Sequence, residues 1–166
     1  MINKIFWFSW FILACDKISA QDMSKFRLYN PPEQAEKRIG ILTREAKAEG
    51  KHVLIQVGNN GCVWCARFTD LVNKDSTIGS LLRDNYIMYH LNSSKENPNE
   101  RILRKYRFPQ RFGYPVFLIL NGRGELIHTQ NSVYLEQGLD YNKEKVREFL
   151  QQWTRSAMDP QQFKIQ

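Results

Sequence analysis

The sequence has few of the residues that build metal centres, with three cysteines and three histidines among 166 residues. A structural zinc ion normally takes four cysteine or histidine ligands. One Cys-x-x-Cys pair is present, Cys62 and Cys65, and no second pair exists to complete such a site. His52, His90 and His128 are far apart in the sequence, as lone structural histidines are. We therefore expect neither a metal site nor a cofactor.

The chain also lacks internal repeats, low-complexity tracts and any apolar run of the roughly 20 residues that a membrane-spanning helix requires. Hydrophobic residues make up 42% of the chain and charged residues 25%, which are ordinary values for a globular protein. A length of 166 residues is enough for one domain with a hydrophobic core and too short for two domains.

The formal net charge is +7, a basic balance that favours acidic partners or anionic membrane surfaces. No sequence signature of a nucleic-acid-binding fold accompanies this charge. Nucleic acid is therefore not an expected partner.

Residues 1–20 have the pattern of an export signal and are excluded from the predicted fold. Lys4 supplies the positive start, and the apolar run 5–14 has the length of a signal-peptide core. Two processing outcomes fit: cleavage after Ala20, or lipidation of Cys15, which follows Ile-Leu-Ala as in a bacterial lipobox. The choice between them stays open. In either case Cys15 is removed or acylated, and a membrane is an expected partner only if Cys15 is lipidated.

The stretch that ends in the cysteine pair carries the strongest functional signal. The apolar run 53–57 predicts a buried strand, and Gly-Asn-Asn-Gly at 58–61 predicts a tight turn, because both residue types tolerate positive φ. Cys62, Cys65 and Phe68 then follow at helical spacing. Cys62 would lie at the first turn of a helix, where free N–H groups and the helix dipole favour a thiolate. Cys65 is placed one turn on, to attack a mixed disulfide at Cys62, which is thiol–disulfide exchange.

Periodicity in the rest of the chain predicts an α/β domain over residues 32–155. A parallel strand–helix–strand crossover precedes an antiparallel hairpin and a closing helix, which implies a central mixed sheet of about four strands flanked by helices. Residues 21–31 would form a loosely held lead-in and 156–166 a flexible tail. The predicted helices are 33–49, one from Cys62, 76–84, 100–106 and one capped by Asn142; the predicted strands are 52–57, 86–91, 116–120 and 125–128, with an irregular connection over 129–141.

The cysteine pair and the later segment Phe112-Gly113-Tyr114-Pro115-Val116 together resemble the thioredoxin superfamily. The similarity is to exported bacterial thioredoxin-like proteins that carry Gly-Asn-x-x-Cys-x-x-Cys ahead of Gly-Tyr-Pro, and it covers about residues 32–153. The resemblance implies a thioredoxin-like fold in which Pro115 is cis and lies against the cysteines. Tyr114 would then present its backbone groups to an extended substrate.

Three features depart from the thioredoxin pattern. Gly61 precedes the first cysteine, where the family usually has tryptophan. The residues between the cysteines, Val63 and Trp64, include neither proline nor a charge. Gln56 stands where thioredoxins bury an acid behind the second cysteine. Because glutamine cannot act as a general base, Cys65 must lose its proton to water or to another group.

Two further features have both a functional and a purely structural interpretation. Trp64, Tyr114 and Phe112 form either an apolar rim for unfolded substrate or ordinary packing. A basic cluster before Pro115 either stabilises the Cys62 thiolate and attracts acidic partners or is a solvated helix face. The cluster consists of Arg101, Arg104, Lys105, Arg107 and Arg111.

These features predict an exported thiol–disulfide oxidoreductase of a bacterial envelope, either periplasmic or anchored as a lipoprotein. Cys62 attacks, Cys65 resolves, and Tyr114, Pro115 and Trp64 contact the substrate. Reduction is favoured over oxidation because the site resembles thioredoxin more than the oxidases. The expected partners are proteins with thiols or disulfides and an unidentified redox donor, and the chain is expected to be monomeric. The alternative is a non-enzymatic binding module with a structural disulfide.

Overall fold

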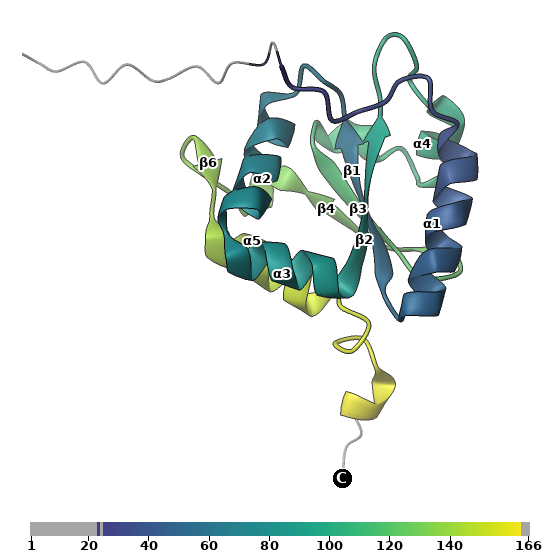
Figure 1. Ribbon diagram of the computed structural model, residues 1–166, viewed down its shortest axis with the longest axis vertical. Helices are drawn as coiled ribbons and strands as arrows, with labels where there is room; N and C mark the ends of the chain where they lie inside the picture. Colours follow the sequence, from purple (N-terminus) through teal and green to yellow (C-terminus); the bar gives the residue numbers. More distant parts are fainter. Residues whose placement is uncertain (1–22, 24, 164–166) are drawn as a thin grey trace, which may run out of the picture.

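The computed structural model describes residues 23 and 25–163 (Figure 1). The predicted signal segment 1–20, including Cys15, lies outside these residues. In the part of the chain that is described, no helix is both long and apolar enough to cross a bilayer.

A four-stranded mixed sheet forms the centre of the domain, in the order β2-β1-β3-β4. Strand β1 (His52–Gly58) pairs in parallel with β2 (Tyr86–Asn92) and antiparallel with β3 (Val116–Leu120). Strand β4 (Leu126–Asn131) pairs antiparallel with β3 at the edge. The crossover, the hairpin and the mixed sheet that the sequence predicts are all confirmed.

Helices cover both faces of this sheet, as Figure 1 shows. Helices α1 (Ala35–Glu49) and α4 (Glu100–Lys105) pack on one face. Helices α2 (Val63–Lys74), α3 (Ser76–Asn85) and α5 (Lys143–Gln152) pack on the other. The central strand β1 is buried along its whole length because its side chains alternate between these two cores.

The helix ends follow from capping residues in the sequence. Gly50 closes α1 in the left-handed region at φ 69°, which a glycine adopts without steric cost. The Asp75 carboxylate accepts from the N–H groups of Thr77 and Ile78 and so caps α3. The Asn142 side chain caps α5 in the same way, which confirms the sequence prediction.

The structure differs from the sequence prediction over residues 129–141. Strand β4 extends to Asn131, because its last residues keep pairing with β3 although they are polar and lack an alternating pattern. The chain then forms a 3-10 helix, η2 (Ser132–Leu135), and a small hairpin of β5 (Glu136–Gln137) and β6 (Asp140–Tyr141). The connection predicted as irregular is therefore ordered, and it packs against α2 through Tyr141.

Candidate active site

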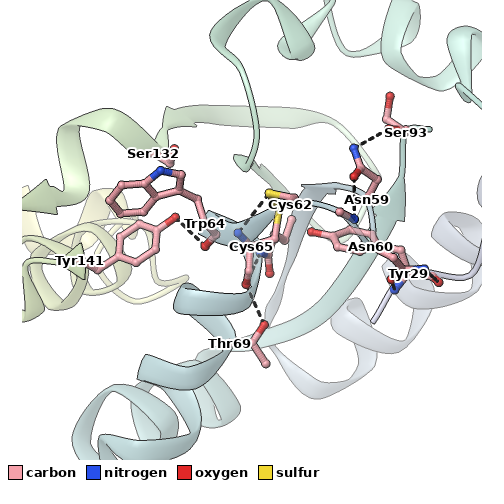
Figure 2. Close-up of a disulfide and its surroundings, with 12 residues drawn as sticks. Tyr29, Asn59, Asn60, Cys62, Trp64, Cys65, Thr69, Ser93, Ser132 and Tyr141 are labelled. Atoms are coloured by element: carbon pink, nitrogen blue, oxygen red, sulfur yellow. Dashed lines mark hydrogen bonds between the residues drawn. A yellow bond between two sulfur atoms is a disulfide. The ribbon is translucent and has the colours of Figure 1, made fainter. Parts of the chain in front are cut away.

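Cys62 and Cys65 form a disulfide at the start of α2 (Figure 2). Cys62 is the N-cap residue, and its Sγ accepts a hydrogen bond from the Cys65 N–H at 3.1 Å. A helix N-terminus presents free N–H groups and the positive end of the dipole, so negative charge on this sulfur is favoured once the disulfide opens. Cys65 is fully buried, whereas Cys62 is partly exposed. Cys62 is thus the sulfur that an external partner can reach.

The turn before Cys62 is fixed by its two asparagines. Asn59 Oδ1 accepts from the Gly61 N–H at 3.0 Å, and Asn59 Nδ2 donates to the Ser93 carbonyl beyond β2 at 3.3 Å. Asn60 Oδ1 accepts from the N–H groups of Leu28 and Tyr29 at 3.0 and 2.9 Å, and its Nδ2 donates to the Tyr29 carbonyl at 3.0 Å. Asn60 therefore attaches the N-terminal segment to the cysteine loop.

Pro115 lies next to this loop. The Tyr114–Pro115 peptide bond is cis, as the resemblance implied, and Pro115 is buried. The register of β1 and β3 ends at the pair Val57–Val116, so Pro115 comes one residue beyond it, beside the end of β1 that leads to Cys62. The structure thus brings Pro115 and the cysteine pair to the same end of the sheet.

The aromatic residues of the predicted rim are held in different ways. Tyr114 is half-buried against the α1-side core, and its hydroxyl is 2.7 Å from Ser93 Oγ. Phe112 is 37% exposed, and the Arg111 guanidinium stacks over its ring. Trp64 is half-buried and packs edge-on against Tyr141, with ring centroids 5.5 Å apart. Of the three side chains, Trp64 alone belongs to α2, and it directly follows Cys62 and Val63.

Tyr141 is a residue of this site that the sequence did not predict. Its hydroxyl donates to the Trp64 carbonyl at 3.3 Å, and its ring packs edge-on against Phe68 at 5.4 Å. Figure 2 shows Tyr141 and Trp64 on one side of the disulfide. The two residues are 77 positions apart in the chain, so no local pattern could have joined them.

Gln56 lies behind Cys65, as the resemblance implied. Its Nε2 donates to the Cys65 carbonyl at 3.2 Å, while its Oε1 is buried without a hydrogen-bond partner among the described residues. The neighbouring Gly58 leaves room for the disulfide, because a Cβ there would lie 2.5 Å from Cys65 Sγ. The site behind the second cysteine is therefore polar but holds no carboxylate at position 56.

Tyr29 is the second residue that sequence reasoning missed. The sequence places it in a loosely held lead-in, but in the structure it is 4% exposed and its hydroxyl is buried without a partner among the described residues. Burial, with a smaller contribution from Tyr141, raises the pKa of this phenol well above its ordinary value. The sequence feature that could have pointed to Tyr29 is the turn residue Asn60, whose side chain forms hydrogen bonds with the Tyr29 backbone.

His90 is a half-buried residue next to Gln56 and Tyr29. It pairs with Gln56 across β1 and β2, and its ring packs edge-on against Tyr29 at 5.8 Å. Burial lowers the pKa of His90 from 6.5 to about 4. The imidazole is therefore neutral at neutral pH.

This lowered pKa predicts that acid destabilises the fold. Because the unfolded chain binds a proton on His90 near pH 6.5 and the folded chain only near pH 4, stability is lost as the pH falls through this window. Between about pH 7 and pH 5, the free energy of unfolding should fall by up to about 2 kcal/mol more in the wild type than in His90→Asn. Urea unfolding at both pH values measures this difference. Equal losses in the two proteins would contradict it.

The part of the basic cluster that lies on helix α4 is not beside the cysteines. It consists of Arg101, Arg104 and Lys105. Helix α4 packs with α1, on the sheet face opposite α2 (Figure 1). Its basic residues are exposed. Arg101 forms an ion pair with Glu36 of α1 at 3.3 Å. The α4 part of the cluster is therefore a solvated helix face.

We expect Arg101→Gln, Arg104→Gln and Lys105→Gln together to leave the pKa of the Cys62 thiol unchanged, because exposed charges on the far face are screened by solvent. The pH dependence of Cys62 alkylation in the reduced protein measures this pKa. Arg67→Gln is the control on the helix that Cys62 caps: the Arg67 guanidinium lies 4.7 Å from the centroid of the Trp64 ring, and loss of a positive charge on this helix should raise the pKa of Cys62. A rise in the triple variant as large as in the control would disprove the expectation.

Among the described residues, no group of three or more His, Cys, Asp or Glu side chains is arranged to hold a metal ion. Residues 42–122 match a family model described as thioredoxin-like. No curated protein sequence matches the chain.

The fold is similar to that of solved bacterial structures. The disulphide isomerase of Xylella fastidiosa Temecula1 aligns with a TM-score of 0.65 and 17% identity, over 75% of this chain and 94% of that one. The DsbD C-terminal domain of Neisseria meningitidis aligns in its oxidised form with a TM-score of 0.51 and 12% identity, over 72% of this chain and 95% of that one. Its reduced form gives a TM-score of 0.52 and 14% identity, over 72% and 96%.

The sheet order, the cysteine pair at the start of α2 and the cis proline beside it define a thioredoxin-like domain. The matched family model and the fold together support assignment of the chain to the thioredoxin superfamily.

Proposed function

We propose that this protein is an exported thiol–disulfide oxidoreductase that reduces disulfides in protein substrates. The observation that carries the proposal is the position of Cys62, which is partly exposed and whose sulfur accepts an N–H bond at the start of α2. A sulfur so placed is a nucleophile at neutral pH, because the thiolate is the reactive form.

The reaction proceeds in two exchanges. The Cys62 thiolate attacks one sulfur of the substrate disulfide, a Cys62–substrate bond forms, and the other substrate sulfur leaves as a thiolate that takes up a proton. Cys65 then attacks Cys62, the internal disulfide forms and the second substrate thiol is released. The substrate gains two electrons and the cysteine pair loses them.

The surface ahead of β3 supports binding of an extended substrate. Pro115 is buried beside the end of β1, and a side chain added at Gly113 would meet open space. The backbone of Tyr114 lies between these two residues, where it would pair with an extended substrate strand. Trp64, two residues after Cys62, supplies an apolar, half-buried ring.

Export to a bacterial envelope rests on the pattern of residues 1–20 and is supported by the bacterial disulphide isomerase and DsbD domain that share the fold. An oxidising compartment suits the function, because disulfides form and persist there. A reductase in that compartment needs a continuing electron donor.

Insulin reduction by the full chain, with dithiothreitol as electron source, tests the proposal. Precipitation of the reduced insulin chain should begin earlier and proceed faster than with dithiothreitol alone. No acceleration would favour the alternative, a binding module in which the Cys62–Cys65 bond is a static structural disulfide.

A further inference from the structure

Two buried polar atoms without hydrogen-bond partners lie around Cys65. They are Gln56 Oε1 and the Tyr29 hydroxyl, two of five such side-chain atoms in the described part of the chain. A buried polar group left unpaired costs about 1–3 kcal/mol, so its retention calls for an explanation. Both atoms adjoin the residue whose chemistry changes when the disulfide opens.

Gly58 defines how close Tyr29 comes to Cys65. A Cβ placed on Gly58 would lie 2.5 Å from Cys65 Sγ and 2.6 Å from the Tyr29 hydroxyl oxygen. The sulfur and the hydroxyl can therefore be no farther apart than these two distances together. No hydrogen bond joins them while the disulfide is closed.

Tyr29 is held firmly in this position. The Asn60 side chain binds its backbone N–H and its carbonyl, at 2.9 and 3.0 Å. Phe26 and His90 pack edge-on against its ring, at 6.4 and 5.8 Å between centroids. Figure 2 shows Tyr29 on the side of the disulfide away from Trp64 and Tyr141. The hydroxyl is thus preorganised beside the second cysteine.

We propose that Tyr29 is a positioning residue for Cys65: its hydroxyl donates a hydrogen bond to the Cys65 sulfur once the disulfide opens, and so stabilises the resolving thiolate. A disulfide sulfur is a weak acceptor, whereas a thiolate is a strong one, which explains why the hydroxyl has no partner among the described residues in the closed state. This inference rests on the proposed function.

The groups around Tyr29 suit a donor and not a base. Burial raises the pKa of its phenol well above the ordinary value, so the proton stays on the oxygen. Gln56 from β1 is neutral, and burial keeps His90 from β2 uncharged by lowering its pKa to about 4. Tyr141 is protonated as well, because burial raises its pKa above the ordinary value. None of these four groups carries a charge, so the Tyr29 hydroxyl can act as a neutral hydrogen-bond donor to the buried Cys65 thiolate.

Atoms and electrons balance in the second exchange, which is the step that Tyr29 assists. The Cys65 thiol gives up its proton, its sulfur attacks Cys62, and the Cys62–Cys65 bond forms as the Cys62–substrate bond breaks. The leaving substrate sulfur takes up a proton from solvent and departs as a thiol. Tyr29 keeps its own proton throughout and lowers the pKa of the Cys65 thiol.

An aromatic disulfide that releases a coloured thiolate separates the two exchanges in the reduced full chain. The first release reports attack by Cys62, and the second reports attack by Cys65 on the mixed disulfide. In Tyr29→Phe the second phase should slow about tenfold, which corresponds to about one unit in the pKa of Cys65, and the first phase should keep its rate. Tyr89→Phe is the matched control, because it removes a hydroxyl from a buried tyrosine on the opposite face and should slow neither phase.

Stability distinguishes this role from a structural one. Because the hydroxyl has no partner in the described part of the closed form, disulfide-bonded Tyr29→Phe should unfold at the same urea concentration as the wild type or a higher one. An unchanged second phase in Tyr29→Phe overturns the role of Tyr29 while the exchange function stands. A wild-type chain that shows no second release overturns the exchange function, and this inference with it.

Discussion

Cys62→Ser should reduce insulin no faster than dithiothreitol alone. The serine hydroxyl is not ionised at neutral pH, so the favourable N–H environment at the start of α2 has no anion to stabilise. Cys65 cannot substitute for Cys62 because it is fully buried beneath the helix start. The insulin assay with matched protein concentrations gives the comparison directly.

Cys65→Ser is the partner variant and should fail in a different way. Cys62 keeps its position and still attacks, but no thiol resolves the product, so a mixed disulfide accumulates. Non-reducing electrophoresis of the full chain mixed with oxidised insulin should show a conjugate that dithiothreitol removes. Cys62→Ser should give no such conjugate. A conjugate in Cys62→Ser but not in Cys65→Ser would reverse the roles of the two cysteines.

The core of this fold could be predicted because its signals are local. The apolar run 53–57, the Gly-Asn-Asn-Gly turn and the helical spacing after Cys62 lie within one short stretch and specify strand, turn and helix. The stripe from Ala35 to Ala46, with Gly50 after it, specifies α1 in the same way. Each of these elements forms where its own residues favour it.

The residues around the cysteines that the sequence did not predict depend on long-range contacts. Tyr29 lies 31 positions before Asn60, and Tyr141 lies 77 positions after Trp64. Each lies in a segment without helical or strand periodicity, so sequence patterning gives no reason to expect burial. Their positions follow from hydrogen bonds that form only after the sheet and α2 have brought the segments together.

Gln56, which stands where thioredoxins have an acid, changes how Cys65 can lose its proton. A carboxylate behind the second cysteine can remove its proton, whereas the Gln56 amide cannot. The structure places the buried Tyr29 phenol next to Gly58, where it assists a Cys65 thiolate by hydrogen bonding instead. A hydrogen bond from the Tyr29 hydroxyl lowers the pKa of the Cys65 thiol but does not take up its proton. The proton must therefore pass to solvent once the mixed disulfide with the substrate has formed.

Gly58→Ala should be among the most damaging single changes near the site, although it adds only one methyl group. That methyl would lie 2.5 Å from Cys65 Sγ and 2.6 Å from the Tyr29 hydroxyl oxygen, both well inside contact distance. Gly58 is buried in the central strand, so neither the backbone nor the disulfide can shift freely. We expect a loss of about 2–3 kcal/mol in the free energy of unfolding, measured with urea on the disulfide form.

Gly61→Ala is the matched control, because it lies in the same turn but is exposed and its added Cβ would come no closer than 3.4 Å to Asn59 Oδ1. It should change the stability by less than about 0.5 kcal/mol. The double variant Gly58→Ala with Tyr29→Phe removes the hydroxyl contact and should recover about 1 kcal/mol relative to Gly58→Ala. If the two changes are additive, the Tyr29 hydroxyl does not face Gly58, and its proximity to Cys65 is refuted as well.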